Sequence, residues 1–222
     1  NPHVVIQPNS FQIDDNYISR LKKDFKDIKI SKTFSGEGIV IVNDQAKGVI
    51  LKGVEKNEKN ITKFFNDFLS TGNLNNLNNN KVFIGSELAY NLKLKKGDNL
   101  NLMTSSFVGT PLGNLPKQEN FEVAGVFNTG FVEFDQNIIF LNIKDALSIF
   151  DKKKQDQNIE IYLDNPLDAD VYKEKIQKLN ENYFIYTWSD LNKSLFSALK
   201  VERNVMFIIL SLIIVVATFN II

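Results

Sequence analysis

Apolar residues recur three and four positions apart in three stretches of the chain, which predicts amphipathic helices. The first follows Asp14, a good helix-capping residue, and the other two lie at residues 60–70 and 166–179. The apolar positions of the first are Tyr17, Ile18, Leu21, Phe25 and Ile28. Shorter helices are expected at residues 86–92 and 143–150.

Short apolar or alternating runs bounded by turn residues predict strands between these helices. They lie at residues 4–6, 39–43, 48–54, 81–85, 99–103, 121–127, 137–141, 158–163 and 183–188. The middle of the chain is rich in strands and turns, which indicates a small β-barrel-like or sandwich unit.

The β–α–β order after residue 158 repeats the layout of the first fifty residues. We therefore expect an α+β fold in which the two ends of the chain form one subdomain and the β-rich part is an insertion. The expected divisions are residues 1–52, 53–150, 151–188 and 189–222.

The connection TSSFVGTPLGNLPKQ, residues 104–118, is much longer than most links between two strands. It has two prolines and two glycines and places leucines between them. We expect a long, stiffened loop that offers apolar side chains to a partner. A long loop with no partner is the alternative.

Residues 205–222 are apolar except for Ser211, Thr218 and Asn220, and no charged residue interrupts them. A helix of this length would span about 27 Å, close to the hydrocarbon thickness of a bilayer. No Gly or Pro occurs from Ser189 onwards. We therefore expect one continuous helix, capped by Ser189, from an extramembrane domain into the membrane, and a chain that is a piece of a larger membrane protein.

Composition argues against several kinds of chemistry. The formal net charge is zero, which does not suit nucleic-acid binding. The chain has no cysteine and a single histidine, His3, which we interpret as an ordinary surface residue. The glycines of Gly36-Glu37-Gly38 precede a strand, so they do not form a dinucleotide-binding loop. Aspartates at expected helix starts suit capping. We expect no catalytic residues, no metal site and no cofactor.

Two groups of motifs resemble the lipoprotein-releasing (Lol) permeases, in particular the LolC type. The first lies at the expected membrane helix and consists of Val201-Glu202-Arg203-Asn204 and Phe219-Asn220-Ile221-Ile222. The second consists of IGSELAYNLKLKKGD, GDNLNLM and FEVAGVF around the long connection. In the connection, Thr110, Pro111, Gly113 and Pro116 match the Thr-Pro-x-Gly-x-x-Pro pattern of the family's hook loop.

The resemblance implies a MacB-like periplasmic domain, with a porter-type α+β subdomain and an inserted β-rich sabre-type subdomain. Such permeases are multi-pass inner-membrane proteins of Gram-negative bacteria. Their partners are the periplasmic chaperone LolA, a second permease subunit (LolE-like or a second copy), the cytoplasmic ATPase LolD and the lipoprotein cargo. The chain itself would not be an enzyme.

The resemblance also implies three groups of site residues. The hook residues are Thr110, Pro111, Leu112, Gly113, Asn114, Leu115 and Pro116. The family's basic pad beside the hook corresponds here to Asn101, Gln118 and Glu119, so this sequence departs from the pattern, and Lys117 is the only nearby cation. Val205 and Met206 are candidates for a lipid cavity, with ordinary helix packing as the alternative.

Other functions stay open at this point. A permease that drives efflux or activates a cell-wall hydrolase would share the mechanotransmitting layout but would not need the hook. A membrane-anchored enzyme would need a nucleophile, base or metal set that the residues do not offer.

Overall fold

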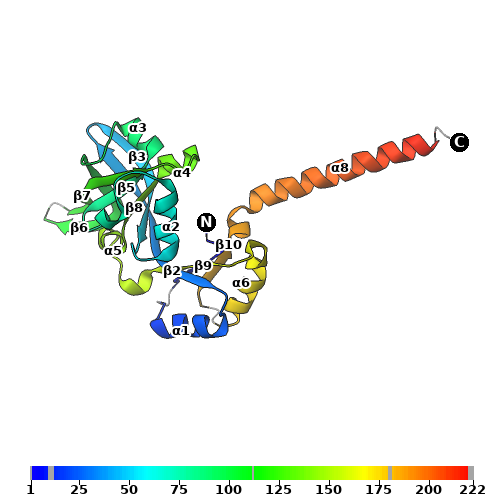
Figure 1. Cartoon of the computed structure of the whole chain (residues 1–222), viewed down its shortest axis with the longest axis horizontal. Helices are drawn as coiled ribbons and strands as arrows, with labels where there is room; N and C mark the ends of the chain where they lie inside the picture. Colours follow the sequence, from blue (N-terminus) through cyan, green and yellow to red (C-terminus); the bar gives the residue numbers. More distant parts are fainter. Residues whose placement is uncertain (1, 10–12, 112, 180–181, 220–222) are drawn as a thin grey trace.

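The computed structural model describes residues 2–9, 13–111, 113–179 and 182–219. Over these residues the protein forms two lobes, and one long helix projects from the smaller lobe (Figure 1). The apolar spacing of the sequence accounts for both cores, because each helix turns its apolar positions toward a sheet.

The small lobe joins residues from both ends of the chain into one antiparallel sheet. Its strands, in order across the sheet, are β10 (Phe184–Thr187), β1 (Val4–Gln7), β9 (Asn158–Tyr162) and the first part of β2 (Lys29–Val42). Helices α1 (Asp15–Asp24) and α6 (Ala169–Gln177) cover one face of the sheet (Figure 1). Asp14 caps α1 as predicted, since its Oδ1 accepts a hydrogen bond from Tyr17 N at 2.7 Å.

The large lobe contains a closed β-barrel, in agreement with one of the two expectations for the strand-rich middle. The ring runs through the second part of β2, β3 (Gln45–Val54), β8 (Ile138–Asn142), β5 (Lys81–Gly85), β7 (Gly113–Phe127) and β6 (Asn99–Thr110), which pairs again with β2. β4 (Leu69–Thr71) adds to β7 outside the ring.

Four helices complete the large lobe. They are α2 (Lys59–Phe68), α3 (Ser86–Leu92), α4 (Val132–Asn137) and α5 (Ile143–Ile149). One apolar cluster joins the barrel strands to α3 and α5. A second, rich in phenylalanine, lies under α2, where Phe65 packs against Phe83 and Phe140. The short 3-10 turns η1 (Leu74–Asn76), η2 (Lys154–Asp156) and η3 (Pro166–Asp168) lie in connections.

Strand β2 belongs to both lobes. Residues Lys29 to Thr33 pair with β9 in the small lobe, whereas residues Phe34 to Val42 pair with β3 in the barrel. The division at residue 52 stays a prediction of domain boundaries, but the two cores themselves change over within β2.

The connection at residues 104–118 is not a loop, which corrects the expectation from the sequence. β6 extends to Thr110 and β7 starts at Gly113, so the segment forms the end of a long hairpin. Cross-strand pairing supplies hydrogen bonds that the Pro- and Gly-rich sequence did not reveal.

The helix expected from Ser189 onwards is interrupted. A short helix α7 (Trp188–Leu191) is followed by Asn192, whose φ of −108° and ψ of 22° are not helical, and α8 (Lys193–Phe219) begins after it. Thr187 caps α7, and Ser189 lies inside it, so the predicted cap was wrong. Asn192 Nδ2 donates to Trp188 O at 2.7 Å, which closes the short turn locally.

Candidate functional site: the β6–β7 hairpin and the helix junction

The outer part of the β6–β7 hairpin is a ladder that ends in a tight turn. Phe107 pairs with Pro116, Val108 with Leu115, and Thr110 with Gly113. Gly113 has a φ of +114°, which a residue with a Cβ adopts only with strain. Thr110 Oγ1 donates to Gly113 O at 2.7 Å, so the turn is held by a side chain as well as by the ladder.

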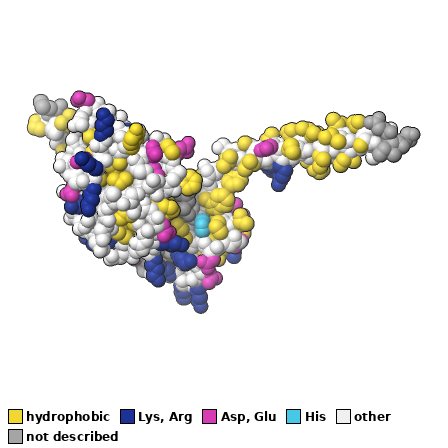
Figure 2. Space-filling model, turned by 45° about the horizontal axis from the view of Figure 1, so that its top comes forward, with side chains coloured by type: hydrophobic (Ala, Val, Ile, Leu, Met, Phe, Trp, Pro, Cys, Tyr) yellow, Lys and Arg dark blue, Asp and Glu magenta, His cyan; other side chains and the backbone are white. Residues whose placement is uncertain are grey.

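The hairpin presents apolar side chains to solvent. Phe107 is 63% exposed, Val108 47% and Leu115 53%. Pro111, Asn114 and Pro116 are exposed too, whereas Leu112 lies outside the described residues. The hairpin lies on the far side of the large lobe from α8 (Figure 1), and Figure 2 shows hydrophobic atoms on this projection. The sequence had not singled out Phe107 and Val108, because they were assigned to a loop.

The expected pad residues do not share one face. Asn101 and Gln118 are on the same face of the hairpin as Met103, which pairs with Gln118. Glu119 pairs with Leu102 and therefore faces the other way. Lys117 is on the side of Glu119, and its Nζ lies 3.3 Å from Glu119 Oε1. Asn101 and Gln118 carry no charge, so the two residues on the Met103 face form no basic surface.

A shallow groove continues from the hairpin across the barrel. Its lining includes Ile39, Ile50, Met103, Phe107, Pro116 and Glu37. Ile50 is 42% exposed. The apolar surface of the hairpin is therefore continuous with that of the neighbouring strands.

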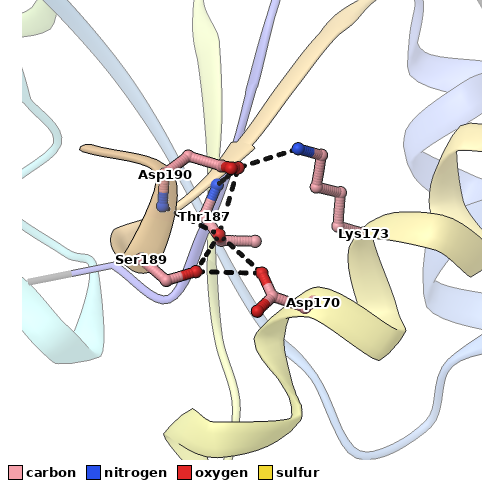
Figure 3. Close-up of polar contacts among 5 residues, drawn as sticks. All are labelled: Asp170, Lys173, Thr187, Ser189 and Asp190. Atoms are coloured by element: carbon pink, nitrogen blue, oxygen red, sulfur yellow. Dashed lines mark hydrogen bonds and ion pairs between the residues drawn. The ribbon is translucent and has the colours of Figure 1, made fainter. Parts of the chain in front are cut away.

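A second polar cluster lies where the chain leaves the small lobe for α8 (Figure 3). Asp170 on α6 accepts hydrogen bonds from Thr187 Oγ1 at 2.8 Å and from Ser189 Oγ at 2.9 Å. Lys173 Nζ, also on α6, lies 2.8 Å from Asp190 Oδ2. Asp190 Oδ2 in turn accepts from Thr187 N at 2.9 Å. These bonds tie α7 to α6 and to the end of β10.

The same cluster holds the Asp190 carboxyl in its charged form. Its hydrogen bond with Lys173 is the main cause, followed by the backbone hydrogen bond from Thr187, and together they lower the pKa of Asp190 below its usual value. Trp188 reinforces the junction, because its Nε1 donates to Pro166 O at 2.9 Å and its ring packs on Phe196 at 5.4 Å.

Helix α8 is the one helix in the described part of the chain that is long and apolar enough to cross a membrane. Val205 is 48% exposed and Met206 64% exposed, so neither packs into a core in this chain. Their assignment to a lipid cavity stays a prediction. Ser211 Oγ donates to Phe207 O at 2.8 Å, which satisfies this polar side chain within the helix.

His3 is not the surface residue that we expected. Its Nδ1 accepts a hydrogen bond from Leu163 N at 2.8 Å, and burial lowers its pKa. It therefore links β1 to the end of β9. Within the described ranges, no group of three or more His, Cys, Asp or Glu side chains is arranged to hold a metal ion.

Comparisons with known proteins agree with this architecture. The chain superposes on the periplasmic region of MacB from Actinobacillus actinomycetemcomitans with a TM-score of 0.53, 13% identity and coverage of 88% of this chain and 92% of that one. It superposes on the extracellular domain of the ABC-type transporter YknZ from Gram-positive bacteria with a TM-score of 0.53, 12% identity and coverage of 84% and 100%. No family model matches the sequence.

Among curated proteins, the chain is similar to several that are named lipoprotein-releasing system transmembrane protein LolC. It is 27% identical to that of Xylella fastidiosa strain 9a5c over 82% of the chain and 45% of the relative. For Buchnera aphidicola subsp. Schizaphis graminum the identity is 28% over 100% and 55%. For Haemophilus influenzae it is 31% over 71% and 38%. The chain spans about half the length of these relatives.

The fold is therefore that of the MacB-type extracytoplasmic domain, an α+β architecture followed by an apolar helix, which confirms the predicted fold class. Within this class the chain is LolC-like over most of its length, which confirms the resemblance that the motifs indicated.

Proposed function

We propose that this chain is the periplasmic domain, with the start of a membrane helix, of an inner-membrane ABC transporter permease that releases lipoproteins. Its hairpin recruits the chaperone LolA, and its junction with α8 transmits movement driven by a separate ATPase subunit, LolD. A second permease subunit and the lipoprotein cargo complete the proposed system. The chain itself does no chemistry.

The exposed apolar hairpin carries this proposal. Phe107, Val108 and Leu115 project from a rigid two-stranded support in a LolC-like domain. Apolar anchors on a pre-ordered support bind with a small entropic cost. The hairpin also lies far from α8, on a side where a soluble partner can approach without meeting the membrane (Figure 1).

The test is binding of purified LolA to the full-length permease in lipid nanodiscs. The Phe107→Ser/Leu115→Ser variant removes two exposed apolar anchors, and we expect the Kd to rise by about tenfold or more. Leu167→Ser is the matched control, because Leu167 is 77% exposed on η3 in the other lobe. Its Kd should equal that of the unchanged protein.

An unchanged Kd in the hairpin variant would contradict the proposal. The alternative function is a mechanotransmitting permease of a related efflux or cell-wall-hydrolase-activating system, and the fold shared with the YknZ domain favours it. In that case transport or activation would survive the hairpin variant.

A further inference from the structure

The hairpin has a weak point where its ladder is interrupted. Regular pairing stops after Met103–Gln118 and resumes at Phe107–Pro116. Three residues of β6 lie opposite one residue of β7 in this interval, so the arms lose cross-strand hydrogen bonds there. Four residue pairs lie beyond the interruption. The outer hairpin is therefore a lever whose direction the barrel ladder alone does not determine.

Two side chains in the interrupted interval reach the same helix end. Thr104 Oγ1 donates to Ile149 O at 2.8 Å, and Lys117 Nζ donates to Ser148 O at 2.6 Å. These carbonyls belong to the last turn of α5, where helix carbonyls lack partners in the helix and carry partial negative charge. A cation suits this position.

Burial makes both contacts specific. Thr104 is 5% exposed, so Ile149 O would lose its buried donor if the hydroxyl were removed. The Lys117 side chain is 24% exposed and also lies 3.3 Å from Glu119 Oε1. Ser106 N approaches Thr104 Oγ1 at 3.4 Å, which connects the extra residues of β6 to the same hydroxyl.

We propose that Thr104 and Lys117 are positioning residues that clamp the β6–β7 hairpin to the C-terminal end of α5 and so set the direction in which its apolar tip points. The inference rests on the proposed function, because it assigns these residues a part in chaperone recruitment. The clamp lowers the ordering cost of binding by holding the hairpin in its binding direction beforehand.

The test uses spin labels in the full-length permease. The chain has no cysteine, so Asn114→Cys at the tip and Tyr90→Cys on α3, which is 79% exposed, accept labels selectively. We expect a narrow distance distribution in the unchanged background. Thr104→Val and Lys117→Met should broaden it and raise the Kd for LolA by about tenfold when combined.

Conservative variants separate positioning from simple damage. Thr104→Ser and Lys117→Arg keep a donor at each position, so they should restore the narrow distribution and the affinity. Lys81→Met is the matched control, because it removes another lysine–glutamate pair of the barrel, Lys81–Glu122, and should leave both readouts unchanged.

A narrow distribution in the Thr104→Val/Lys117→Met variant would overturn the clamp, and a broadened distribution with an unchanged Kd would overturn its role in binding. If the unchanged permease does not bind LolA at all, the proposed function fails, and the distance distributions still decide whether the clamp exists.

Discussion

Asp170 Oδ1 lies 2.8 Å from Thr187 Oγ1, and this contact joins helix α6 to the last residue of β10 directly before the chain turns toward α8. Thr187 is fully buried, whereas the break in helical geometry comes five residues later at Asn192. The small lobe and α7 therefore form one hydrogen-bonded unit. A change in the direction of α8 is most easily absorbed at Asn192.

Removing the Thr187 hydroxyl should weaken this unit. Thr187→Val loses the cap of α7 and one donor to Asp170, so we expect the free energy of unfolding to fall by about 1–2 kcal/mol. Trp188 is the only tryptophan in the chain, so its fluorescence in a urea titration reports on the junction. Thr187→Ser keeps the hydroxyl and should lose less, and equal loss in both variants would argue against the role of the hydrogen bonds.

Stability of the junction should depend on acid through Asp190. Lys173 and the Thr187 backbone lower the pKa of Asp190 in the folded state. The carboxylate therefore stabilises the fold at neutral pH, and this contribution is lost as the pH falls from the ordinary aspartate value of about 3.9 through the lower folded pKa. The urea midpoints of the unchanged protein and of Asp190→Asn should differ at pH 7 and converge in acid.

The control for this pH dependence is Asp24→Asn, an aspartate at the end of α1 with no ion pair among those of the described residues. Its midpoint should run parallel to that of the unchanged protein. A constant difference between Asp190→Asn and the unchanged protein down to pH 2 would contradict the assignment to Asp190.

Gly36 should not tolerate a methyl group. A Cβ at this position would lie 2.5 Å from Cζ of Phe150, whose ring packs against Phe34 at 5.2 Å. Gly36→Ala should cost about 1–3 kcal/mol of unfolding free energy, measured by urea titration, because the ring must move in a packed core. Gly48→Ala is the control in the same pair of strands, since a Cβ there meets no atom within 4 Å. Equal stability of both variants would contradict the packing argument.

The ion pair between Lys52 and Glu160 should hold the two lobes together. Lys52 Nζ on β3 lies 2.7 Å from Glu160 Oε1 on β9, and the Glu160 side chain is only 6% exposed. Lys52→Met leaves this carboxylate without its cation, so we expect a loss of about 3–5 kcal/mol. The Lys52→Met/Glu160→Gln double variant should lose less. Additive losses in a double-mutant cycle would show that the pair is not coupled.

The sequence predicted much of the secondary structure because its signals are local. Asp14 and the apolar spacing after it were enough to locate α1. Helix α4 was missed, because Val132–Asn137 is too short to show an apolar period and lies between two strand-like runs. The strands of the barrel were recognised singly, but their order around the ring depends on pairings between distant segments.

The candidate site was predicted only in part, for the same reason. Thr110, Gly113 and Leu115 were identified by motif, whereas Phe107 was missed because its exposure follows from the hairpin register. Lys117 was considered as a free cation, but in the folded chain it contacts Ser148 O and Glu119. Such contacts cannot be read from spacing, since 31 residues separate Lys117 from Ser148.

The sequence by itself therefore determined the α+β class, the apolar helix and the LolC resemblance, because composition, periodicity and motifs are properties of short segments. Only the tertiary structure decided that the hook is a hairpin, that Asn101 and Glu119 face opposite ways, and that the helix is broken at Asn192. Each of these depends on cross-strand register or on hydrogen bonds between elements, which exist only once distant segments have packed together.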